Sequence, residues 1–390
     1  GGYLENLIGF DVIFRSPSCR PDIPEIQAEI KRGAFLTSEI ELVLKLAPGT
    51  KIGVTGSDGK TTTTTLIYEI LKEKGLNCYL GGNIGTPIFT EIAKTKPEDF
   101  IVLELSSFQL MNMKISPNIS VITNITPNHL DIHKSFEEYI EAKKNIFKFQ
   151  GKDDVLVINY DDEITKEFAN EANGKVVYFS KKCNINDGFM LDGDYIVNAN
   201  TGEKILNGKE LYLRGRHNYE NVCTALSATR DLVDIDTALK AIKNFKGVEH
   251  RIEFVREIEG VKWYNDSIGS SPTRTIAGLN SFDENIVLIA GGYDKHLDYY
   301  PLAKPIIDNV GSLVLFGQTS EKIYNAVMNE EGHEKVKIYR VDNMEEAINK
   351  AKSVAQCGDV VLFSPASASF DMFKNFMERG KKFKEMVNLL

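Results

Sequence analysis

Apolar residues recur along the chain at the spacings of buried strands and of amphipathic helices, and these spacings predict the secondary structure. Strands are predicted at 11–14 and 34–36 around a helix at 23–31, which together make a small α/β unit. Between 40 and 246 short apolar strands alternate with helical segments, and this rhythm predicts a largely parallel sheet with helices on both faces. The predicted strands lie at 51–55, 77–80, 100–105, 119–125, 155–159 and 176–179, and the predicted helices at 136–149, 219–232 and 235–244.

The rhythm changes at 190–213, where Asp-Gly and Asn-Gly pairs predict hairpins. After Gly247 strands and helices alternate again, which predicts a second, Rossmann-like sheet. At 390 residues the chain is too long for one ordinary hydrophobic core. We therefore expect an α/β protein of three parts, 1–39, 40–246 and 247–390. The predicted strands of the last part lie at 251–255, 261–264, 285–290, 312–316, 337–341 and 360–363.

A glycine-rich run separates the strand at 51–55 from a helix that continues through 66–71. Such a break turns backbone N–H groups and the positive end of a helix towards an anion. The pattern is shorter than the full phosphate loop, which would have glycine in place of Val54, so a turn with a surface lysine is the alternative. Because threonine forms helices poorly, the threonines at 61–65 favour a role at the first turn, where hydroxyls satisfy unpaired N–H groups. The predicted phosphate cradle consists of Gly56, Ser57, Asp58, Gly59, Lys60, Thr61, Thr62 and Thr63.

Polar residues also follow the next strands of the predicted sheet. Glu104 ends the strand at 100–105 and is a candidate Mg²⁺ ligand, because an acid at a neighbouring strand end holds the metal in phosphate-loop enzymes. The following strand leads into Asn124-Ile-Thr-Pro-Asn-His129-Leu-Asp131, so His129 is a second candidate. Three strand ends would then place phosphate- or metal-binding groups on one rim of the sheet. For each residue taken alone, a satisfied polar side chain is the alternative.

Two further loops are candidates for substrate contacts. In Gly81-Gly-Asn83-Ile-Gly85 the backbone and the Asn83 amide could approach a ligand closely. Ser16 lies in the loop after the strand at 11–14, at the end of a parallel strand where ligands bind. A plain polar turn is the alternative for both loops.

Composition and charge narrow the class of protein. Contents of 42% apolar and 26% charged residues are ordinary for a globular protein, and a net charge of −9 argues against a nucleic-acid surface. Five cysteines without a Cys-x-x-Cys pair favour a reducing compartment and no zinc site. No apolar run reaches membrane-spanning length and no leader-like segment opens the chain, so we expect a cytoplasmic protein without membrane contact. Because the chain begins at Gly1 and not at methionine, we also expect that a preceding segment is missing.

The chain resembles the Mur ligases, ATP-dependent enzymes that form amide bonds in peptidoglycan synthesis. It is most similar to the members that join D-glutamate to UDP-N-acetylmuramoyl-L-alanine. The resemblance implies that 1–39 is the remainder of a uridine-nucleotide domain, that 40–246 binds ATP and that 247–390 binds the amino acid. A monomer that acts on these small molecules is expected. The motifs that carry the resemblance are TGSDGKTT, GGNIGTP, ELSSFQL, NITPNHLD, YIEAKKNIF, GRHNYENVCTAL, EHRIE, YNDSIGSSP, GGYDKHLDY and SPASASFDMFKNF.

The resemblance implies a role for each matching residue. Lys60 and Thr61 would hold the ATP phosphates and a first Mg²⁺, Glu104 would bind the same metal, and His129 a second. Lys143 would be carbamylated by CO₂, whereas the residues alone predict a surface helix lysine there. The remaining implied contacts are Asn218, Asn221, Arg251 and Asp266 to the nucleotide, Ser16 and Asn83 to the muramoyl substrate, and Ser270, Lys295, Ser369, Phe370 and Phe376 to the substrates, D-glutamate above all.

Two departures and three rival functions remain open from the sequence. Ile268 stands where many members carry lysine, which puts one cationic contact in doubt, and the start at Gly1 puts uridine-nucleotide recognition in doubt. The nearest rival is another Mur ligase or a folylpolyglutamate synthase. The others are a P-loop phosphotransferase or ATP-binding regulator, and a binding module without activity. The predicted reaction passes through an acyl phosphate.

Overall fold

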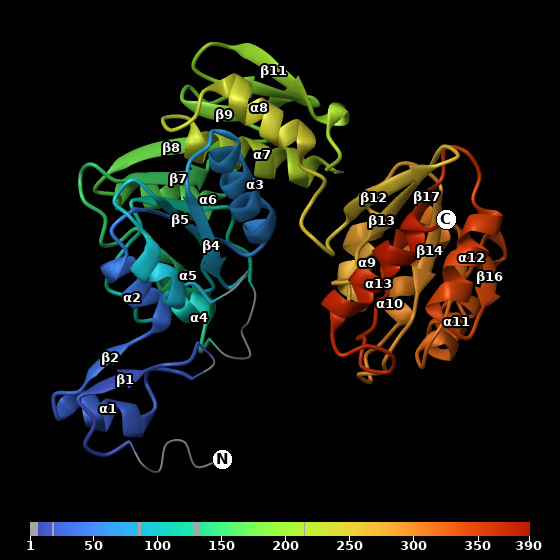
Figure 1. Cartoon of the computed structure of the whole chain (residues 1–390), viewed down its shortest axis with the longest axis horizontal. Coiled ribbons are helices and arrows are strands. Elements are labelled where there is room, and N and C mark those ends of the chain that lie inside the picture. The colour runs from blue at the N-terminus through green and yellow to red at the C-terminus, as the bar shows by residue number, and fades with distance from the viewer. Residues whose placement is uncertain (1–6, 18, 85–86, 128–132, 214) are drawn as a thin grey trace. The chain divides into compact units, whose positions relative to one another are not determined.

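A nine-stranded sheet forms the centre of the first part of the chain in the computed structural model, which describes residues 7–17, 19–84, 87–127, 133–213 and 215–390 (Figure 1). The chain divides into two units. The first comprises Gly1–Leu211 with Arg216–Phe245, and the second comprises Tyr212–Gly215 with Lys246–Leu390. The three domains expected from the sequence stay a prediction.

The first unit places strand β3 (Thr50–Thr55) between β6 (Ile119–Ile122) and β5 (Phe100–Glu104). These strands run parallel, so the loops that follow them meet at one edge of the sheet, as predicted. Strand β10 (Tyr195–Asn198) pairs antiparallel with both β9 (Gly188–Asp192) and β11 (Glu203–Asn207), which confirms the predicted hairpins. The other strands of this sheet are β4 (Cys78–Gly82) beside β5, and β7 (Val155–Asn159), β8 (Lys175–Ser180), β9 (Gly188–Asp192), β10 (Tyr195–Asn198) and β11 (Glu203–Asn207) beyond β6.

Helices cover both faces of this sheet because successive side chains of a strand point to opposite sides. Ile101 and Leu103 of β5 belong to a buried core shared with α2 (Glu39–Leu46) and α5 (Phe136–Lys144). On the other face α3 (Lys60–Glu73) contacts β5, and it packs beside α7 (Arg216–Thr229) and α8 (Ile235–Asn244), as Figure 1 shows. The shorter helices are α4 (Ser107–Leu110), α6 (Glu163–Glu167), η1 (Phe89–Lys94), η2 (Phe168–Asn170) and η3 (Gly208–Glu210).

The N-terminal strands β1 (Val12–Phe14) and β2 (Phe35–Thr37) pair in parallel beside α1 (Pro24–Lys31). Arg15 ties them to the sheet, since its buried guanidinium donates from Nη2 to the carbonyl of Phe108 at 2.7 Å and from Nη1 to that of Cys19 at 2.8 Å. Arg20 adds an ion pair with Glu138 of α5 at 2.7 Å. The loop that carries Ser16 is therefore held against α4 and α5.

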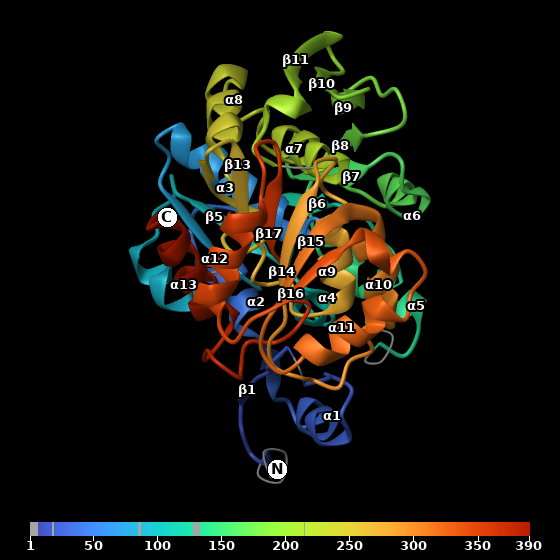
Figure 2. The same cartoon turned by 90° about the vertical axis from the view of Figure 1, so that its right-hand side faces the viewer.

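The second unit is a six-stranded sheet in the order β12-β13-β17-β14-β15-β16, parallel except for β12. Leu288 of β14 faces a core with α9, α10 and α11, whereas Val287 and Ile289 face α12 and α13. Figure 2 shows these two helical layers on either side of the strands. The elements are β12 (Glu253–Ile258), β13 (Val261–Asn265), α9 (Pro272–Leu279), β14 (Ile286–Ala290), α10 (Tyr300–Asn309), β15 (Val310–Leu315), α11 (Ser320–Met328), η4 (His333–Lys335), β16 (Lys337–Arg340), α12 (Met344–Val354), β17 (Val360–Phe363) and α13 (Phe376–Asn388).

The elements that differ from the sequence prediction include a strand and two helices of the first unit. The strand at 119–125 ends at Ile122, because the amide of Ile125 is satisfied by the carboxylate of Asp162 at 2.7 Å and not by a strand. The helix at 136–149 ends at Lys144, after which tighter turns bury Ile146 and Phe147. Helix α2 was not predicted, although Ser38 caps its N-terminus by accepting from Glu41 N.

Candidate nucleotide-binding site

Two glycines shape the loop between β3 and α3. Gly56 has a φ of +149° and Gly59 a φ of +79°, which residues with a side chain rarely adopt. A Cβ on Gly56 would collide with the hydroxyl of Thr123, and one on Gly59 with Asn221 Oδ1. The glycines thus let two neighbouring elements approach the loop closely. The loop leads into the first turn of α3, which has no side-chain cap, and unpaired N–H groups of such a turn can bind an anion.

Lys60, the first residue of α3, folds back over this loop. Its Nζ donates to the carbonyl oxygens of Gly56 at 2.9 Å and Ser57 at 2.8 Å. Ser57 is buried, and its Oγ accepts from Thr126 N at 2.9 Å and lies 2.9 Å from the Tyr139 hydroxyl. Hydrogen bonds within the protein therefore organise the cradle, and a bound phosphate would compete with two carbonyls for the Lys60 ammonium.

The loop after β6 supports the cradle from the other side. Thr123 Oγ1 donates to the carbonyl of Asp58 at 2.5 Å, and the Asp58 amide donates to Asn124 Oδ1 at 2.9 Å. The Asp58 side chain itself is exposed. These contacts place the ends of β3 and β6 together, as the sequence predicted.

The threonine run behaves differently from the prediction. Thr62, Thr63 and Thr64 are buried, with at most 6% of their surface exposed. Thr64 and Thr65 donate from their hydroxyls to the carbonyls one helical turn earlier, at 2.7 and 2.8 Å. The expectation that hydroxyls satisfy unpaired N–H groups is therefore wrong for Thr64 and Thr65, because carbonyls four residues earlier lie closer to a helical hydroxyl.

Glu104, at the end of β5, is buried and only half satisfied. Its Oε1 accepts from Asn83 Nδ2 at 2.8 Å. The backbone N–H of Asn83 donates to the backbone carbonyl of Glu104, also at 2.8 Å. Its Oε2 is buried, and none of the residues that the structure describes forms a hydrogen bond with it. Gly82 makes the approach of this loop possible, because a Cβ there would collide with the Glu104 carbonyl. An unpaired buried carboxylate oxygen is costly, so a cation or donor from a ligand fits this position.

Lys143 is fully buried, contrary to the surface position that the residues alone predicted. It lies on α5 with 1% of its surface exposed. Its Nζ donates to Gly56 O at 2.8 Å and Thr55 Oγ1 at 3.2 Å, and it lies 4.7 Å from the ring centre of Tyr139. Lys143 therefore contacts the start of the phosphate loop through hydrogen bonds to Thr55 and Gly56.

The surroundings of Lys143 disfavour its charge. Burial lowers the pKa of the Lys143 amine well below its usual value, and the positive charge of Lys60 lowers it further. The carboxylates of Asp58 and Glu104 act in the opposite direction on this pKa, with a smaller effect than burial. A neutral amine is the form that reacts with CO₂, so the site favours carbamate chemistry.

Helix α7 brings two asparagines to the cradle. Asn221 Oδ1 accepts from Thr63 Oγ1 at 3.4 Å across 158 residues of sequence, and Asn221 Nδ2 donates to Asn218 Oδ1 at 3.1 Å. Both asparagines are buried. The structure therefore joins Asn218 and Asn221 to the first turn of α3, and their contact with a nucleotide stays a prediction.

The oxygen donors around the cradle suit Mg²⁺. Glu104 Oε2 is unpartnered, and the Thr61 hydroxyl belongs to the first turn of α3. Within the described ranges no group of three or more His, Cys, Asp and Glu side chains is arranged to hold a metal, so a metal here needs other ligands, such as phosphate oxygens. His129, the predicted second ligand, lies outside the described residues.

In the second unit Asp266 follows β13 and is buried. Its Oδ2 accepts from Ser364 Oγ at 2.6 Å and its Oδ1 from Ile252 N at 3.2 Å. Burial raises the pKa of Asp266 to about 6, and the hydrogen bonds and the nearby charge of Arg251 oppose that rise. Arg251 lies between His250 and Ile252, which have φ of 67° and 43°. The structure thus brings Arg251 and Asp266 together in a constrained loop.

Replacing Asp266 with asparagine should remove a pH-dependent loss of stability. Because the folded pKa of about 6 lies above the usual 3.8, the carboxyl costs nothing below pH 3.8 and its full penalty above pH 6. That penalty is on the order of 3 kcal/mol. The stability of Asp266→Asn relative to the parent should therefore rise between pH 4 and pH 8 in urea unfolding. The surface variant Asp308→Asn serves as the control, and parallel curves for Asp266→Asn and the parent would contradict the prediction.

The residues predicted to bind the amino-acid substrate fall into two groups. Lys295 Nζ lies 5.5 Å from the ring centre of Phe370, whose side chain is exposed. Ser369 is buried beside it. In the part of the chain that the structure describes, no hydrogen bond, ion pair or ring contact joins Ser270 or Phe376 to Lys295 or Phe370. Lys295, Ser369 and Phe370 therefore form the candidate receptor for an amino acid.

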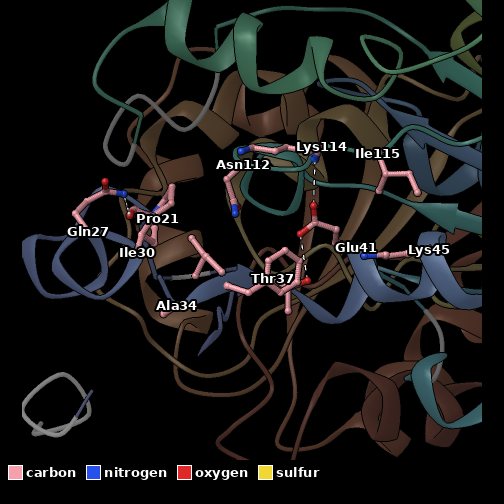
Figure 3. Close-up of a pocket in the computed structure, with 12 residues that line it drawn as sticks. Pro21, Gln27, Ile30, Ala34, Thr37, Glu41, Lys45, Asn112, Lys114 and Ile115 are labelled. Carbon is pink, nitrogen blue, oxygen red and sulfur yellow. Dashed lines mark hydrogen bonds between the residues drawn. The ribbon is translucent and has the colours of Figure 1, made fainter. Parts of the chain in front are cut away.

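A separate cavity of about 660 Å³ lies among α1, β2, α2 and residues 112–115 (Figure 3). Glu41 lies in its wall, where it accepts from Lys114 N and from Thr37 Oγ1 at 3.2 Å each. The residues that line the cavity include none of the predicted site residues. It is therefore distinct from the phosphate loop.

Sequence reasoning missed two residues of the cradle, Thr123 and Tyr139. Tyr139 is four residues before Lys143 on α5, so helical spacing was a signal that both lie on one face. Thr123 gave no signal, because its contact with Asp58 depends on the pairing of β3 with β6.

The phosphate loop, the half-satisfied Glu104 and the buried Lys143, together with a Rossmann-like second unit, define a nucleotide-binding enzyme of the P-loop class. Residues 54–229 match the family model of the Mur ligase middle domain, and residues 250–367 match the model described as Mur ligase, glutamate ligase domain. The chain belongs to the Mur ligase family.

Known relatives agree over nearly the whole chain. It is 54% identical over 394 residues to UDP-N-acetylmuramoylalanine--D-glutamate ligase of Acetivibrio thermocellus, covering 99% of this chain and 84% of that protein. It is 50% identical over 390 residues to the protein of the same name from Clostridium botulinum, covering 100% and 85%. The crystal structure of UDP-N-acetylmuramate-alanine ligase from Thermotoga maritima aligns with a TM-score of 0.66 at 21% identity, covering 100% and 88%, which shows the fold alone.

These findings confirm the predicted α/β Mur ligase fold and the prediction of an ATP-dependent ligase. Each helix that the structure describes is too short or too polar to cross a lipid bilayer. The roles of individual residues, the second metal and the carbamate stay predictions.

Proposed function

We propose that this chain joins D-glutamate to UDP-N-acetylmuramoyl-L-alanine through an amide bond, with cleavage of ATP to ADP and phosphate. The observation that carries the proposal is the 54% identity to a ligase of that name over 99% of the chain. The cluster of Lys60, Glu104 and Lys143 at one end of a parallel sheet supports it, because phosphoryl transfer needs positive charge and metal ligands around the phosphates.

The proposed reaction has two steps. A carboxylate oxygen of the L-alanine residue attacks the γ-phosphorus of ATP, the bond from that phosphorus to the ADP oxygen breaks, and an acyl phosphate forms. The D-glutamate amine then attacks the acyl carbon, the tetrahedral intermediate expels phosphate, and the amine loses a proton to solvent. Both steps bring anions together. Lys60 and the N–H groups at the start of α3 would neutralise charge on the phosphates.

Mg²⁺ would be held by Thr61 and Glu104 at a first site and by His129 at a second. When bound, the metal neutralises phosphate charge and polarises the γ-phosphoryl group. The support from this chain is the buried Glu104 Oε2, which has no hydrogen-bond partner among the described residues.

We further propose that Lys143 is carbamylated: its neutral amine adds to CO₂, a C–N bond forms, and a proton leaves to give an anionic carbamate. The lowered pKa of Lys143 supports this step.

D-Glutamate carries two carboxylates, and the second unit offers matching groups. Lys295 supplies an ammonium beside the exposed ring of Phe370. Ser369 lies next to them in sequence. Ser16 and Asn83 are proposed to contact the muramoyl substrate, and Asn83 has the support of its contact with Glu104. Asn218, Asn221, Arg251 and Asp266 are proposed for the nucleotide. A monomer stays a prediction.

Phosphate release from ATP tests this function. We expect release only when UDP-N-acetylmuramoyl-L-alanine and D-glutamate are both present, and none with L-glutamate, L-alanine or a diamino acid. Release with another amine would favour a different amide ligase, and release without any amine would favour a phosphotransferase. If no amine caused phosphate release, although the protein still bound ATP, the result would contradict the proposal for this chain and favour a binding module.

A further inference from the structure

Arg379, on α13 of the second unit, is a buried cation with only neutral hydrogen-bond partners. Its surface is 1% exposed, and its guanidinium lies 5.9 Å from the ring centre of Phe363. Among the residues that the structure describes, no carboxylate forms an ion pair with it. Burial lowers the pKa of Arg379 to about 10, so the group stays charged at neutral pH. A buried charge without an ion-pair partner is costly and calls for a functional reason.

The two edges of the guanidinium hold two different loops. Nη1 donates to the carbonyl oxygens of Ser367 at 3.0 Å and Ala368 at 2.8 Å, in the loop after β17. Nε and Nη2 donate to the Oγ of Ser267 at 3.1 Å and to its carbonyl at 2.8 Å, in the loop after β13. β13 and β17 are neighbouring parallel strands, so both loops leave the same edge of the sheet. Arg379 thus sets the distance between them.

A third loop meets the same point. The amide of Tyr293 donates to the Ala368 carbonyl at 2.9 Å, so that oxygen accepts from both Tyr293 and Arg379. A Cβ on Gly292 would lie 3.1 Å from Arg379 Nη1, so glycine leaves room for the guanidinium. The loop that contains Gly292 and Tyr293 continues to Lys295. All three loops that carry the candidate amino-acid residues therefore meet around one side chain.

Only arginine suits this position among the basic residues. Its planar fork presents donors along two edges, whereas the lysine ammonium is a single point at the end of a flexible stem. Lysine at 379 would keep the charge but could not hold Ser267 and the carbonyls of Ser367 and Ala368 at once. The lysine substitution therefore disturbs the geometry of the loops without removing the positive charge at this position.

We propose that Arg379 is a positioning residue for the incoming amino acid, because it holds the loops of Ser267, Tyr293 and Ala368 and so fixes Lys295, Ser369 and Phe370. This inference rests on the proposed D-glutamate ligase function. Arg379 does not itself touch the amino acid. It acts through the neighbouring loops and through its positive charge, which attracts the carboxylates of the amino acid.

The test compares Arg379→Lys and Arg379→Gln with the parent in the phosphate-release assay. We expect the KM for D-glutamate to rise about 10- to 100-fold in both variants, since several charge-assisted hydrogen bonds are lost. The KM for ATP and for the muramoyl substrate should change less than about twofold. Arg256→Lys is the matched control, because Arg256 also donates to a backbone carbonyl, that of Asn388, but on the surface.

Amide hydrogen exchange provides a readout that needs no substrate. In Arg379→Lys the amides of Tyr293 and Phe373 should exchange faster, while those of the central strands β14 and β15 keep their protection. An unchanged KM for D-glutamate, an equal rise in all three KM values, or unchanged exchange would each overturn the proposal. If phosphate release by the parent enzyme did not depend on D-glutamate, the proposed function would be overturned. The exchange result would still decide whether Arg379 fixes the loops.

Discussion

Replacing Lys143 with methionine should reduce ligation about a thousandfold or more while leaving the protein at least as stable as the parent. The activity falls because the variant cannot form the proposed carbamate and loses a group at the start of the phosphate loop, where transition-state charge has to be stabilised. The stability is retained because methionine fills a similar volume without a charge in a site that is 1% exposed. Phosphate-release kinetics and thermal unfolding measure the two effects.

The pH dependence of that stability gives the prediction a definite sign. The pKa of Lys143 is lowered in the folded protein, so the unfolded chain binds the proton more tightly below pH 10.5. The parent therefore loses stability relative to Lys143→Met as the pH falls from 10.5 towards the folded pKa. In CO₂-free buffer the Tm advantage of the variant should therefore grow as the pH falls from about 10.5 towards neutral.

Lys144→Met is the matched control for Lys143→Met. Lys144 is the next residue of α5, but its Nζ forms ion pairs with Glu171 and Glu141 at 2.7 and 3.0 Å. The Lys144→Met variant should keep full activity. With ¹³C-bicarbonate the parent and Lys144→Met should show a carbamate carbon signal that Lys143→Met lacks. An active Lys143→Met enzyme, or a carbamate signal that survives in it, would refute the role of this lysine.

Lys60→Met should abolish phosphate release and weaken ATP binding, with a loss in kcat/KM of about a thousandfold or more. Lys60 is the first residue of α3, and its ammonium lies over the loop between β3 and α3 through hydrogen bonds to the carbonyls of Gly56 and Ser57. Removing it leaves the phosphates of a bound nucleotide facing N–H groups without a compensating charge. Calorimetric titration with ATP and the release assay measure the two losses.

Stability separates a local from a global effect of Lys60→Met. Two hydrogen bonds from the ammonium are lost, so unfolding free energy should fall by about 1–3 kcal/mol. Lys72→Met, on the same helix with 57% of its side chain exposed, should change neither binding nor stability measurably. Full turnover by Lys60→Met would remove the phosphate loop from the mechanism.

The sequence predicted the phosphate loop and the positions of most strands along the chain, because both depend on patterns of neighbouring residues. Apolar runs of strand length and the spacing of Gly56, Gly59 and Lys60 need no knowledge of distant residues. The positions of Glu104 and Asn83 on the same rim follow from the rule that ligand-binding loops of parallel strands share one edge. Element ends were predicted less well, as with α5, because long-range contacts decide where a helix stops.

The tertiary structure alone decided which of these residues are chemically unusual. Lys143 looks like any helix lysine in sequence, and only its burial against Gly56 and Tyr139 makes its charge unfavourable. Asn221 meets Gly59 because α7 packs along α3, and Arg379 meets the loops after β13 and β17 because those strands are neighbours. Burial and electrostatic environment depend on residues far apart in the chain, so a local pattern of residues does not contain them.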